Sequence, residues 1–504
     1  MNTALVRVLF GATLLISVAD QIPLCNTRWV PDESWYGDGG KTLMLEGRLR
    51  LSTFPPIDTF SRVDTRPPAM SAALALSFKM FGVGLWQARL PSYIARTTAI
   101  LLVFLLGVRY GGMWAGLAAA VLMLSDNYLF VAGRTARPEA AETVLMILTL
   151  WLYHQARERK SLPLTFLASL AAVTAMAFHV AGVGVAVSLG LLLLLELRFS
   201  AWKSARAWCF ALTMAAALAS FALWIRSDAD HVAAYRALYS ARASVPYNEK
   251  LNQELDRYKD FVGLGNQRFP LPVNIPIRAH IAVAILASIL VLWRYNRTAA
   301  LDLAVCAAVN LIWWTFLVNK TARYFSMEAP LFALLIALTG VALIRKTAWR
   351  RTGLAALALL LVSQLAGNAA LLYSFRNADY RTVTQQLRAA IPIDKSAYGL
   401  TTFWLALNDR KYYAYDRAPF PYALSMLKPD YLILNDRVMM YGNGFGEDDF
   451  RELRELSNEF ARRSAVLVAT VPSPYYGKLV VYRVCYADSA VRACATTDSK
   501  VNSK

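Results

Sequence analysis

Long apolar segments separated by short charged loops dominate the pattern of this 504-residue chain. A membrane-spanning helix needs about 20 mainly apolar residues, although tilted or partly enclosed helices can be shorter. This criterion predicts eleven spans and therefore an all-α polytopic membrane protein. The predicted spans are 4–24, 90–108, 112–131, 139–154, 162–178, 181–198, 205–225, 276–293, 299–318, 329–344 and 352–374. The composition agrees, with 57% hydrophobic residues and a mean hydropathy of +0.37.

The distribution of Lys and Arg predicts the orientation of these spans. With the N-terminus inside, the inner loops hold thirteen Lys or Arg residues, whereas the short outer loops hold four. Cytoplasmic loops usually carry such an excess, so we expect a cytoplasmic N-terminus and a C-terminal region outside. The first apolar run also resembles a signal peptide. Because it is long and lacks a clear small-x-small cleavage site, we interpret it as an uncleaved span.

Three polar segments are expected on the outer side, at 25–89, 226–275 and 376–504. The apolar stretch 68–84 is interpreted as a helix on the membrane surface, because a further span there would reverse every later loop. A helix is predicted at 229–243 in the second segment. The third combines a predicted helix at 380–390 with strands at 431–434 and 479–482, which indicates a small α/β domain. We therefore expect a transmembrane module at 1–375 and a soluble domain at 376–504.

The charge balance and the cysteines exclude several classes of protein. The net charge is +19, but much of the basic charge lies in short loops, where it sets topology and meets anionic lipid headgroups. No nucleic-acid partner is therefore expected. The four scattered histidines and five cysteines show no metal-ligand spacing, and His179 is interpreted as a polar turn between spans. Cys485 and Cys494 are either a disulfide in an extracytoplasmic tail or two free thiols.

An acidic pair, Asp32-Glu33, directly follows the first apolar run, and Tyr36 lies just beyond it. Carboxylates are scarce in this chain, with 34 Asp and Glu against 53 Lys and Arg. A carboxylate at a membrane surface can accept a proton from an attacking hydroxyl group. The alternative is a solvated loop or a helix N-cap.

Cations recur in the other outer loops. Arg66 lies in Thr65-Arg66-Pro67-Pro68, Arg137 precedes Pro138 and Glu139, and Lys320 and Arg323 precede Tyr324. Each also has a structural interpretation, as a span start or an interfacial anchor. Together they would form a cationic rim around a carboxylate. Such a site suits attack by a hydroxyl on a sugar attached to a lipid phosphate, because the cations stabilise the departing phosphate.

The order of short motifs along the chain resembles a known family of membrane enzymes. The motifs are Asp32-Glu33 with Tyr36, Gly47, Pro67-Pro68, Phe81-Gly82, Ala88-Arg89-Leu90-Pro91-Ser92, Ala136-Arg137-Pro138-Glu139, and Arg323-Tyr324 with Pro330. Over roughly residues 1–345 this series resembles the GT-C fold glycosyltransferases that include protein O-mannosyltransferases and lipid A aminoarabinose transferases, of the family 39 and 83 type.

The resemblance implies a function and a set of site residues. The catalytic carboxylate maps to Asp32 with Glu33 beside it, the donor is a sugar on a polyprenyl or dolichyl phosphate, and transfer inverts the anomeric carbon. The cations assigned to the donor phosphate are Arg66, Arg137, Lys320 and Arg323, and the substrate pocket is assigned Tyr36, Asp64, Glu139 and Tyr324. Lipid A enzymes carry Glu-Lys where this chain has Thr65-Arg66, which argues against lipid A as the acceptor. The tail also lacks a match to the β-trefoil of eukaryotic O-mannosyltransferases.

The sequence therefore predicts a glycosyltransferase at the outer side of a bacterial inner membrane, with a polyprenyl-phosphate-linked sugar as donor, membrane lipids around it and an unassigned acceptor. No cofactor is expected, and a divalent cation shared by Asp32, Glu33 and Asp38 is considered but not predicted. The main alternative is a transporter or lipid-linked-sugar flippase, which the largely uncharged spans disfavour. A scaffold subunit is a third interpretation. A cytosolic nucleotide-sugar donor is disfavoured, because no inner Asp-x-Asp or large inner domain is found.

Overall fold

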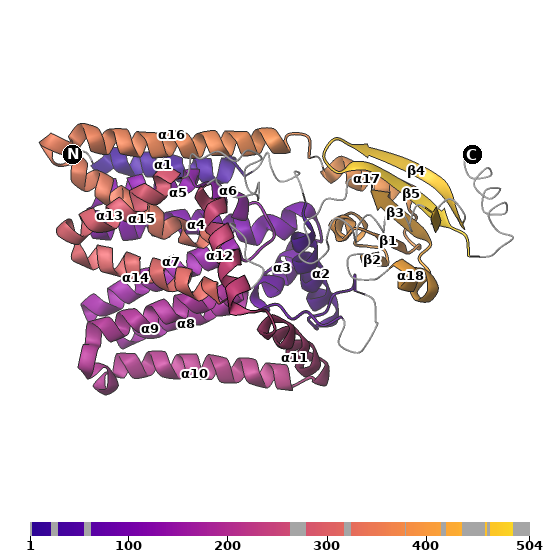
Figure 1. Cartoon of the computed structure of the whole chain (residues 1–504), viewed down its shortest axis with the longest axis horizontal. Helices are drawn as coiled ribbons and strands as arrows, with labels where there is room; N and C mark the ends of the chain where they lie inside the picture. Colours follow the sequence, from indigo (N-terminus) through magenta and orange to yellow (C-terminus); the bar gives the residue numbers. More distant parts are fainter. Residues whose placement is uncertain are drawn as a thin grey trace. The chain divides into compact units, whose positions relative to one another are not determined.

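The chain forms two compact units that each combine distant parts of the sequence. The computed structural model describes residues 3–21, 29–54, 62–262, 279–316, 324–378, 380–414, 420–435, 459–460 and 464–486. Unit 1 comprises Met1–Cys25, Thr65–Met70 and Arg89–Ser374, and unit 2 comprises Asn26–Asp64, Ser71–Ala88 and Phe375–Lys504 (Figure 1). Each unit is described by itself.

Unit 1 is a helical bundle, and within the described residues a helix lies at every predicted span. The helices at these spans are α1 (Thr3–Ala19), α4 (Leu85–Gly111), α5 (Met113–Ser125), α6 (Asn127–Ala132), α7 (Glu139–Arg159), α8 (Leu162–Phe178), α9 (Val183–Leu197), α10 (Ala205–Arg226), α13 (Ala279–Tyr295), α14 (Arg297–Thr315), α15 (Phe325–Ile344) and α16 (Arg350–Phe375). In the described part of the chain, six helices are long and apolar enough to cross a membrane. The number eleven therefore stays a prediction.

The predicted span 112–131 is two helices rather than one. The chain turns at Asp126, whose carboxylate accepts a hydrogen bond of 2.8 Å from the Leu129 N–H and so caps α6. Asn127, the first residue of α6, donates to the carbonyl of Gln364 and to Asn368 Oδ1 on α16, both at 2.7 Å. These bonds to α16 hold the interrupted helix in place.

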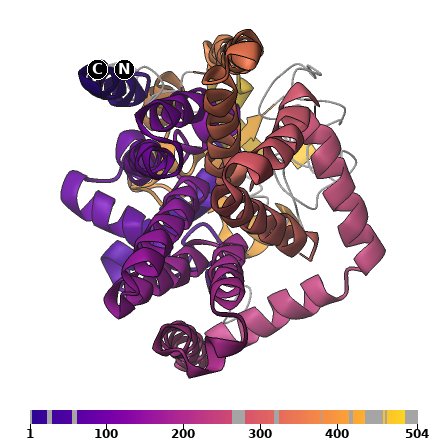
Figure 2. The same cartoon turned by 90° about the vertical axis from the view of Figure 1, so that its left-hand side faces the viewer.

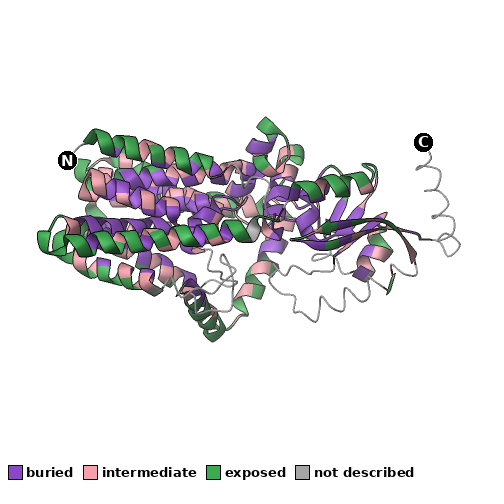
Figure 3. Ribbon diagram, turned by 90° about the horizontal axis from the view of Figure 1, so that it is seen from above, coloured by how far each residue is buried: buried purple, intermediate pink, exposed green. Residues whose placement is uncertain are grey.

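The core of unit 1 is centred on α15. In its most apolar window 78% of the residues are buried, and it packs against α5, α7 and α13. At the other extreme, no residue in the apolar window of α10 is buried, and the exposed side chains include Trp208, Leu212 and Leu223. The bundle is seen end-on in Figure 2, and Figure 3 shows buried residues concentrated inside the bundle and exposed residues on its outer helices. An apolar exposed helix of this kind suits contact with lipid.

The spans carry more charge than expected from sequence. Arg96 on α4 is fully buried and forms two hydrogen bonds, of 2.8 and 3.0 Å, with Asp20. Asp302 on α14 is also buried and accepts from Arg157 at 2.9 Å and from Tyr110 at 2.9 Å. Buried charges are tolerated when paired in this way, so these ion pairs tie neighbouring helices together.

Two further helices of unit 1 follow α10. Helix α11 (Ala229–Ala243) confirms the helix predicted at 229–243, whereas α12 (Tyr247–Val262) was not predicted. Helix α12 packs against α13 and α14. It therefore belongs to the bundle, although its sequence is polar.

Unit 2 contains the expected small α/β domain. The strands β1 (Ala397–Gly399), β2 (Tyr412–Ala414), β3 (Tyr431–Asn435), β4 (Ala465–Ser473) and β5 (Gly477–Val484) form one sheet in the order β2-β1-β3-β5-β4. The first three strands pair in parallel, and β5 pairs antiparallel with β3 and β4. Helix α17 (Tyr380–Ala390) has the predicted bounds, and both predicted strands lie within β3 and β5. A short helix, α18 (Phe420–Tyr422), follows β2.

The segment predicted to be the first outer loop shares unit 2 with this sheet, although the sequence analysis grouped it with the transmembrane module. Helix α2 (Pro31–Glu46) begins this loop, and α3 (Ala69–Phe81) occupies the predicted surface helix. The Trp29 N–H donates to Tyr476 Oη at 2.7 Å, and the Ala414 N–H donates to the Thr53 carbonyl at 3.1 Å. Placement of α3 at a membrane surface stays a prediction.

Candidate functional site

The acidic pair lies in the first turn of α2, where the two carboxylates have different surroundings. Pro31 occupies the first helical position, where its missing N–H is not needed. Glu33 is fully buried, and its Oε2 accepts from the Val30 N–H at 3.1 Å, as in a capping box. Asp32 is only half-buried. The N-cap alternative therefore applies to Glu33, and Asp32 is the more accessible carboxylate.

Asp38, one turn further along α2, is committed to the fold of the first loop. Its carboxylate accepts hydrogen bonds from Ser52 Oγ at 2.5 Å, the Thr53 N–H at 2.9 Å and Thr53 Oγ1 at 2.8 Å. Burial raises the pKa of Asp38, while these hydrogen bonds and Lys41 act in the opposite direction. These three donors engage both oxygens of the Asp38 carboxylate. Among the described residues, no group of three or more His, Cys, Asp or Glu is arranged to hold a metal ion.

Two residues assigned to the substrate pocket are also part of unit 2. Tyr36 is buried on α2, and Asp64 is buried next to the antiparallel bridge between Arg50 and Val63. The Asp64 N–H donates to the Leu49 carbonyl at 3.3 Å. The structure therefore gives both residues interior positions.

In unit 1, Arg137 and Glu139 form a buried ion pair just before α7. Arg137 Nε and Nη2 lie 2.9 and 2.6 Å from Glu139 Oε1. Both side chains are less than a tenth exposed. An anion that binds Arg137 therefore meets a guanidinium group already shared with a carboxylate. Arg66 is half-buried, and Lys320 and Arg323 lie outside the described residues.

Glu142 and His179 lie close to this pair and were not predicted from sequence. Glu142, one turn along α7 from Glu139, is fully buried, and its Oε1 lies 3.7 Å from His179 Nδ1. The His179 ring centre lies 5.4 Å from that of Tyr324. The structure thus brings together Arg137, Glu139 and Tyr324 through two unpredicted residues. The spacing Glu139-x-x-Glu142 at the start of a helix was the available signal.

His179 is held neutral by its surroundings. It lies in the turn between α8 and α9, and its Nδ1 accepts a hydrogen bond of 3.2 Å from the Ala181 N–H. Burial is the main cause that lowers the pKa of His179 to about 4, and Arg137 and Arg242 add to this effect while Glu139 opposes it. The neutral ring therefore carries its proton on Nε2.

A second buried cation, Arg257, lies on α12. Its guanidinium carbon lies 4.3 Å from the ring centre of Trp314 and 4.5 Å from that of Phe325. Glu254, one turn earlier, accepts from Arg257 Nε at 3.2 Å. Arg257 is 1% exposed, and its Nη1 has no hydrogen-bond partner in the described structure. The Glu-x-x-Arg spacing beside aromatic residues was the sequence signal for this site.

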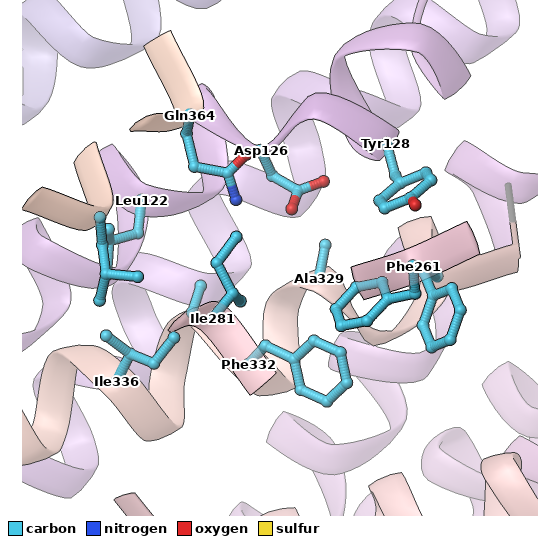
Figure 4. Close-up of a pocket in the computed structure, with 12 residues that line it drawn as sticks. Leu122, Asp126, Tyr128, Phe261, Ile281, Ala329, Phe332, Ile336 and Gln364 are labelled. Carbon is cyan, nitrogen blue, oxygen red and sulfur yellow. The ribbon is translucent and has the colours of Figure 1, made fainter. Parts of the chain in front are cut away.

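An apolar pocket shares the residue Phe325 with this cation. Phe325, which stacks on Arg257, forms part of its wall. Most of the lining is aliphatic or aromatic, contributed by α5, α6, α12, α13, α15 and α16. Figure 4 shows Asp126 and Gln364 near each other at one part of this lining, with the rings of Tyr128, Phe261 and Phe332 at another. Phe325 therefore joins an apolar cavity to a buried cation.

Comparisons with known proteins agree with this architecture. Residues 65–225 match the family model "Dolichyl-phosphate-mannose-protein mannosyltransferase". Among solved structures, the chain is similar to ArnT from Cupriavidus metallidurans bound to undecaprenyl phosphate, with a TM-score of 0.61, 15% identity, and coverage of 96% of this chain and 99% of that chain. It is also similar to the archaeal oligosaccharyltransferase AglB from Archaeoglobus fulgidus in complex with an inhibitory peptide and a dolichol-phosphate. There the TM-score is 0.51 and the identity 12%, over 94% of this chain and 74% of that chain.

A sequence relative supports a more limited comparison. An uncharacterized protein of Aquifex aeolicus (strain VF5) is 28% identical over 152 residues, which are 30% of this chain and 30% of that protein. The match thus spans less than a third of the relative's length. Its name assigns no activity. Taken with the structural matches, the fold predicted from the ordered motifs is confirmed: the chain has the ArnT-like GT-C fold, and residues 65–225 match the mannosyltransferase family model.

Proposed function

We propose that this protein transfers a sugar from a polyprenyl-phosphate donor to a hydroxyl acceptor at the outer face of a bacterial inner membrane. The observation that carries the proposal is the apolar pocket whose wall residue, Phe325, also supports the buried cation Arg257. A lipid phosphate combines the two properties that this arrangement favours. The GT-C fold and the lipid phosphates named with ArnT and AglB support the same donor class.

The donor is proposed to bind through its chain and its phosphate. The isoprenoid chain occupies the pocket beside Phe261 and Phe325, where burial of apolar surface contributes about 25 cal/mol per Å². Arg257 and Arg137 bind the phosphate oxygens, because a guanidinium group presents its N–H groups in a fork that matches phosphate. Arg66, Lys320 and Arg323 complete the proposed set of cations.

In the proposed reaction Asp32 acts as the general base. Its carboxylate takes the proton of the acceptor hydroxyl while the hydroxyl oxygen forms a bond to the anomeric carbon of the sugar. The bond from that carbon to the phosphate oxygen breaks, and the lipid phosphate leaves with the electron pair, so attack from the opposite face inverts the centre. The cations stabilise the negative charge that gathers on the leaving phosphate. Glu33 keeps the first turn of α2 in place, and Tyr36, Asp64, Glu139 and Tyr324 are proposed to line the substrate pocket. No metal is proposed.

A flippase for lipid-linked sugars is the second candidate. The buried charges of the spans, such as Asp302 and Glu142, favour it, because ionisable groups within a membrane often mark transport pathways. The two candidates differ in product. A flippase moves the donor between leaflets unchanged, whereas the proposed transferase releases free lipid phosphate.

Replacement of Asp32 by Asn is the direct test of the proposed base. We expect release of lipid phosphate from a polyprenyl-phosphate sugar to fall by about 100-fold or more, because general-base catalysis typically contributes 10²–10⁴-fold. Glu33→Gln is the matched control, since Gln also completes a capping box. It should retain most activity. Normal turnover by Asp32→Asn would exclude Asp32, and a loss confined to Glu33→Gln would move the base to Glu33.

The donor site is tested by filling the pocket and removing its neighbouring cation. Ala329→Phe narrows the pocket, and Arg257→Gln removes the charge. Loss of a charge-assisted contact costs about 1.5–3 kcal/mol, so Arg257→Gln should weaken donor binding by roughly 10- to 150-fold. Ala219→Phe on exposed α10 is the control and should bind donor normally. Normal donor affinity in both site variants would show that the pocket is not the donor site.

A further inference from the structure

Glu142 and His179 lie beside the proposed donor cation Arg137 but have no part in the proposed reaction. Glu142 is fully buried, and no side chain in the described structure donates a hydrogen bond to its carboxylate. The His179 side chain is 15% exposed. Because the imidazole lies close to a buried carboxylate, a change in the charge nearby can change the protonation of the His179 ring.

The position of Nδ1 gives His179 two hydrogen-bonding states. In the structure Nδ1 accepts from the Ala181 N–H at 3.2 Å, which requires the neutral ring. Glu142 Oε1 lies 3.7 Å from the same nitrogen, too far for a hydrogen bond. In the imidazolium form Nδ1 carries a proton and can only donate. A small ring rotation would then replace the Ala181 contact with a charge-assisted hydrogen bond to Glu142.

The charges facing His179 decide which state is occupied. Helix α7 contributes Glu139 and Glu142, the segment before it contributes Arg137, and α11 contributes Arg242. Tyr324, before α15, packs against the ring. Arg137 and Arg242 disfavour an imidazolium group, and burial does so as well. An anion bound to Arg137 offsets one of these two cations and adds negative charge of its own.

We propose that His179 takes up a proton from solvent when an anionic lipid donor binds at Arg137, and that the new Nδ1–H donates to Glu142. The inference rests on the proposed function, because it needs the donor phosphate to bind Arg137. It makes His179 a positioning residue that favours anionic ligands. The sign follows from linkage: a ligand whose binding takes up a proton binds more tightly as the pH falls, by at most tenfold for each pH unit. His179→Asn should remove this dependence.

The test uses the full chain in detergent and the diester methyl farnesyl phosphate as the probe. This diester keeps a single negative charge across the pH range, so the probe itself does not titrate. Calorimetric titrations near pH 6, in two buffers with different ionisation enthalpies, measure the protons taken up on binding. We expect net uptake by the wild type, and affinity several-fold higher at pH 5 than at pH 8.

Three variants identify the residue that takes up the proton. His179→Asn keeps an acceptor for the Ala181 N–H but cannot be protonated, and Glu142→Gln removes the carboxylate. Uptake should disappear in the first variant and decrease in the second, whereas the control His280→Asn should behave as the wild type.

Each outcome decides between the two proposals. Binding to the wild type without proton uptake, or uptake that persists in His179→Asn, overturns the role of His179 but leaves the proposed function intact. The wild-type measurement alone decides this point if a variant fails to fold. Unchanged affinity in Arg137→Gln, or no binding at all, overturns the Arg137 donor site and the inference together.

Discussion

Two neighbouring side chains in the first turn of α2 have different roles, one structural and one proposed to be catalytic. Glu33 is buried and caps the helix, whereas Asp32 is half-buried. Asp38, on the same helix, is used by the adjoining loop. Only one carboxylate of this acidic cluster is therefore proposed to take part in proton transfer.

Asp38→Ala is expected to destabilise unit 2, because it leaves the donors of Ser52 and Thr53 without their acceptor. The loss should be about 1–3 kcal/mol at pH 5. Burial raises the pKa of Asp38, so its contribution to stability decreases as the pH rises through that raised pKa, and the effect of the substitution should shrink. Thermal unfolding in detergent measures both, with exposed Asp394→Ala as the control. An effect that grows with pH would contradict this account.

Part of the candidate site could be predicted from single residues, and part could not. Asp32 and the Arg137–Glu139 spacing are visible because charges are conspicuous beside apolar runs. His179 was not predicted, since its partner Glu142 is 37 residues earlier in the chain and comes close only when α7 packs against the turn after α8. Arg257 was missed because α12 has a polar sequence and the residues that it buries, Glu254, Arg257, Asp260 and Phe261, are mostly charged.

The positions of the helices were predicted from the sequence, whereas a break within one predicted helix was not. Apolar windows report length and composition, so they located the helices of the bundle. Apolar windows do not show where the backbone changes direction. The turn at Asp126 between α5 and α6 could therefore not be predicted from them. The bonds that hold this turn come from α16, more than 200 residues away in the chain. Strands were predicted where β-branched and aromatic residues cluster, as in β3 and β5.

Gly37 on α2 is expected to tolerate no side chain. A Cβ atom there would lie 2.7 Å from the Trp404 ring, which cannot move aside easily because Trp404 is 1% exposed. Gly37→Ala should therefore destabilise unit 2 by about 1–3 kcal/mol, as is typical of overpacking. Gly11→Ala on α1 is the matched control, because nothing lies within 4 Å of its added Cβ. Equal melting temperatures for the two variants would show that α2 and Trp404 are not packed in this way.

The complete molecule combines a membrane bundle with a unit built from both the first loop and the C-terminal segment. Sequence patterns predicted that both segments are polar and external. They did not show that the two fold together, because the contact between Trp29 and Tyr476 joins residues 447 positions apart. Such pairing depends on tertiary packing and has no local signature.

The orientation predicted from Lys and Arg can be measured on the whole chain. We expect a cysteine at position 394, in Asp394→Cys, to react with a membrane-impermeant maleimide in intact spheroplasts. A cysteine at position 200, in Ser200→Cys, should react only after the membrane is opened, because it lies in the cation-rich loop after α9. Both positions are exposed, so access to the reagent decides the result. The unsubstituted chain reports labelling of native cysteines, and the reverse pattern would invert the predicted topology.

Unit 2 is built from segments near the two ends of the chain, which has a consequence for its biosynthesis. The ribosome completes Trp29 long before Tyr476, and at about 5–20 residues per second the delay is roughly 20–90 s. During that time the amide of Trp29 and the surface of α2 around Gly37 lack the partners that cover them in the finished protein. The nascent chain therefore passes through a stage at which its first polar loop lacks the contacts that protect a folded segment from proteases.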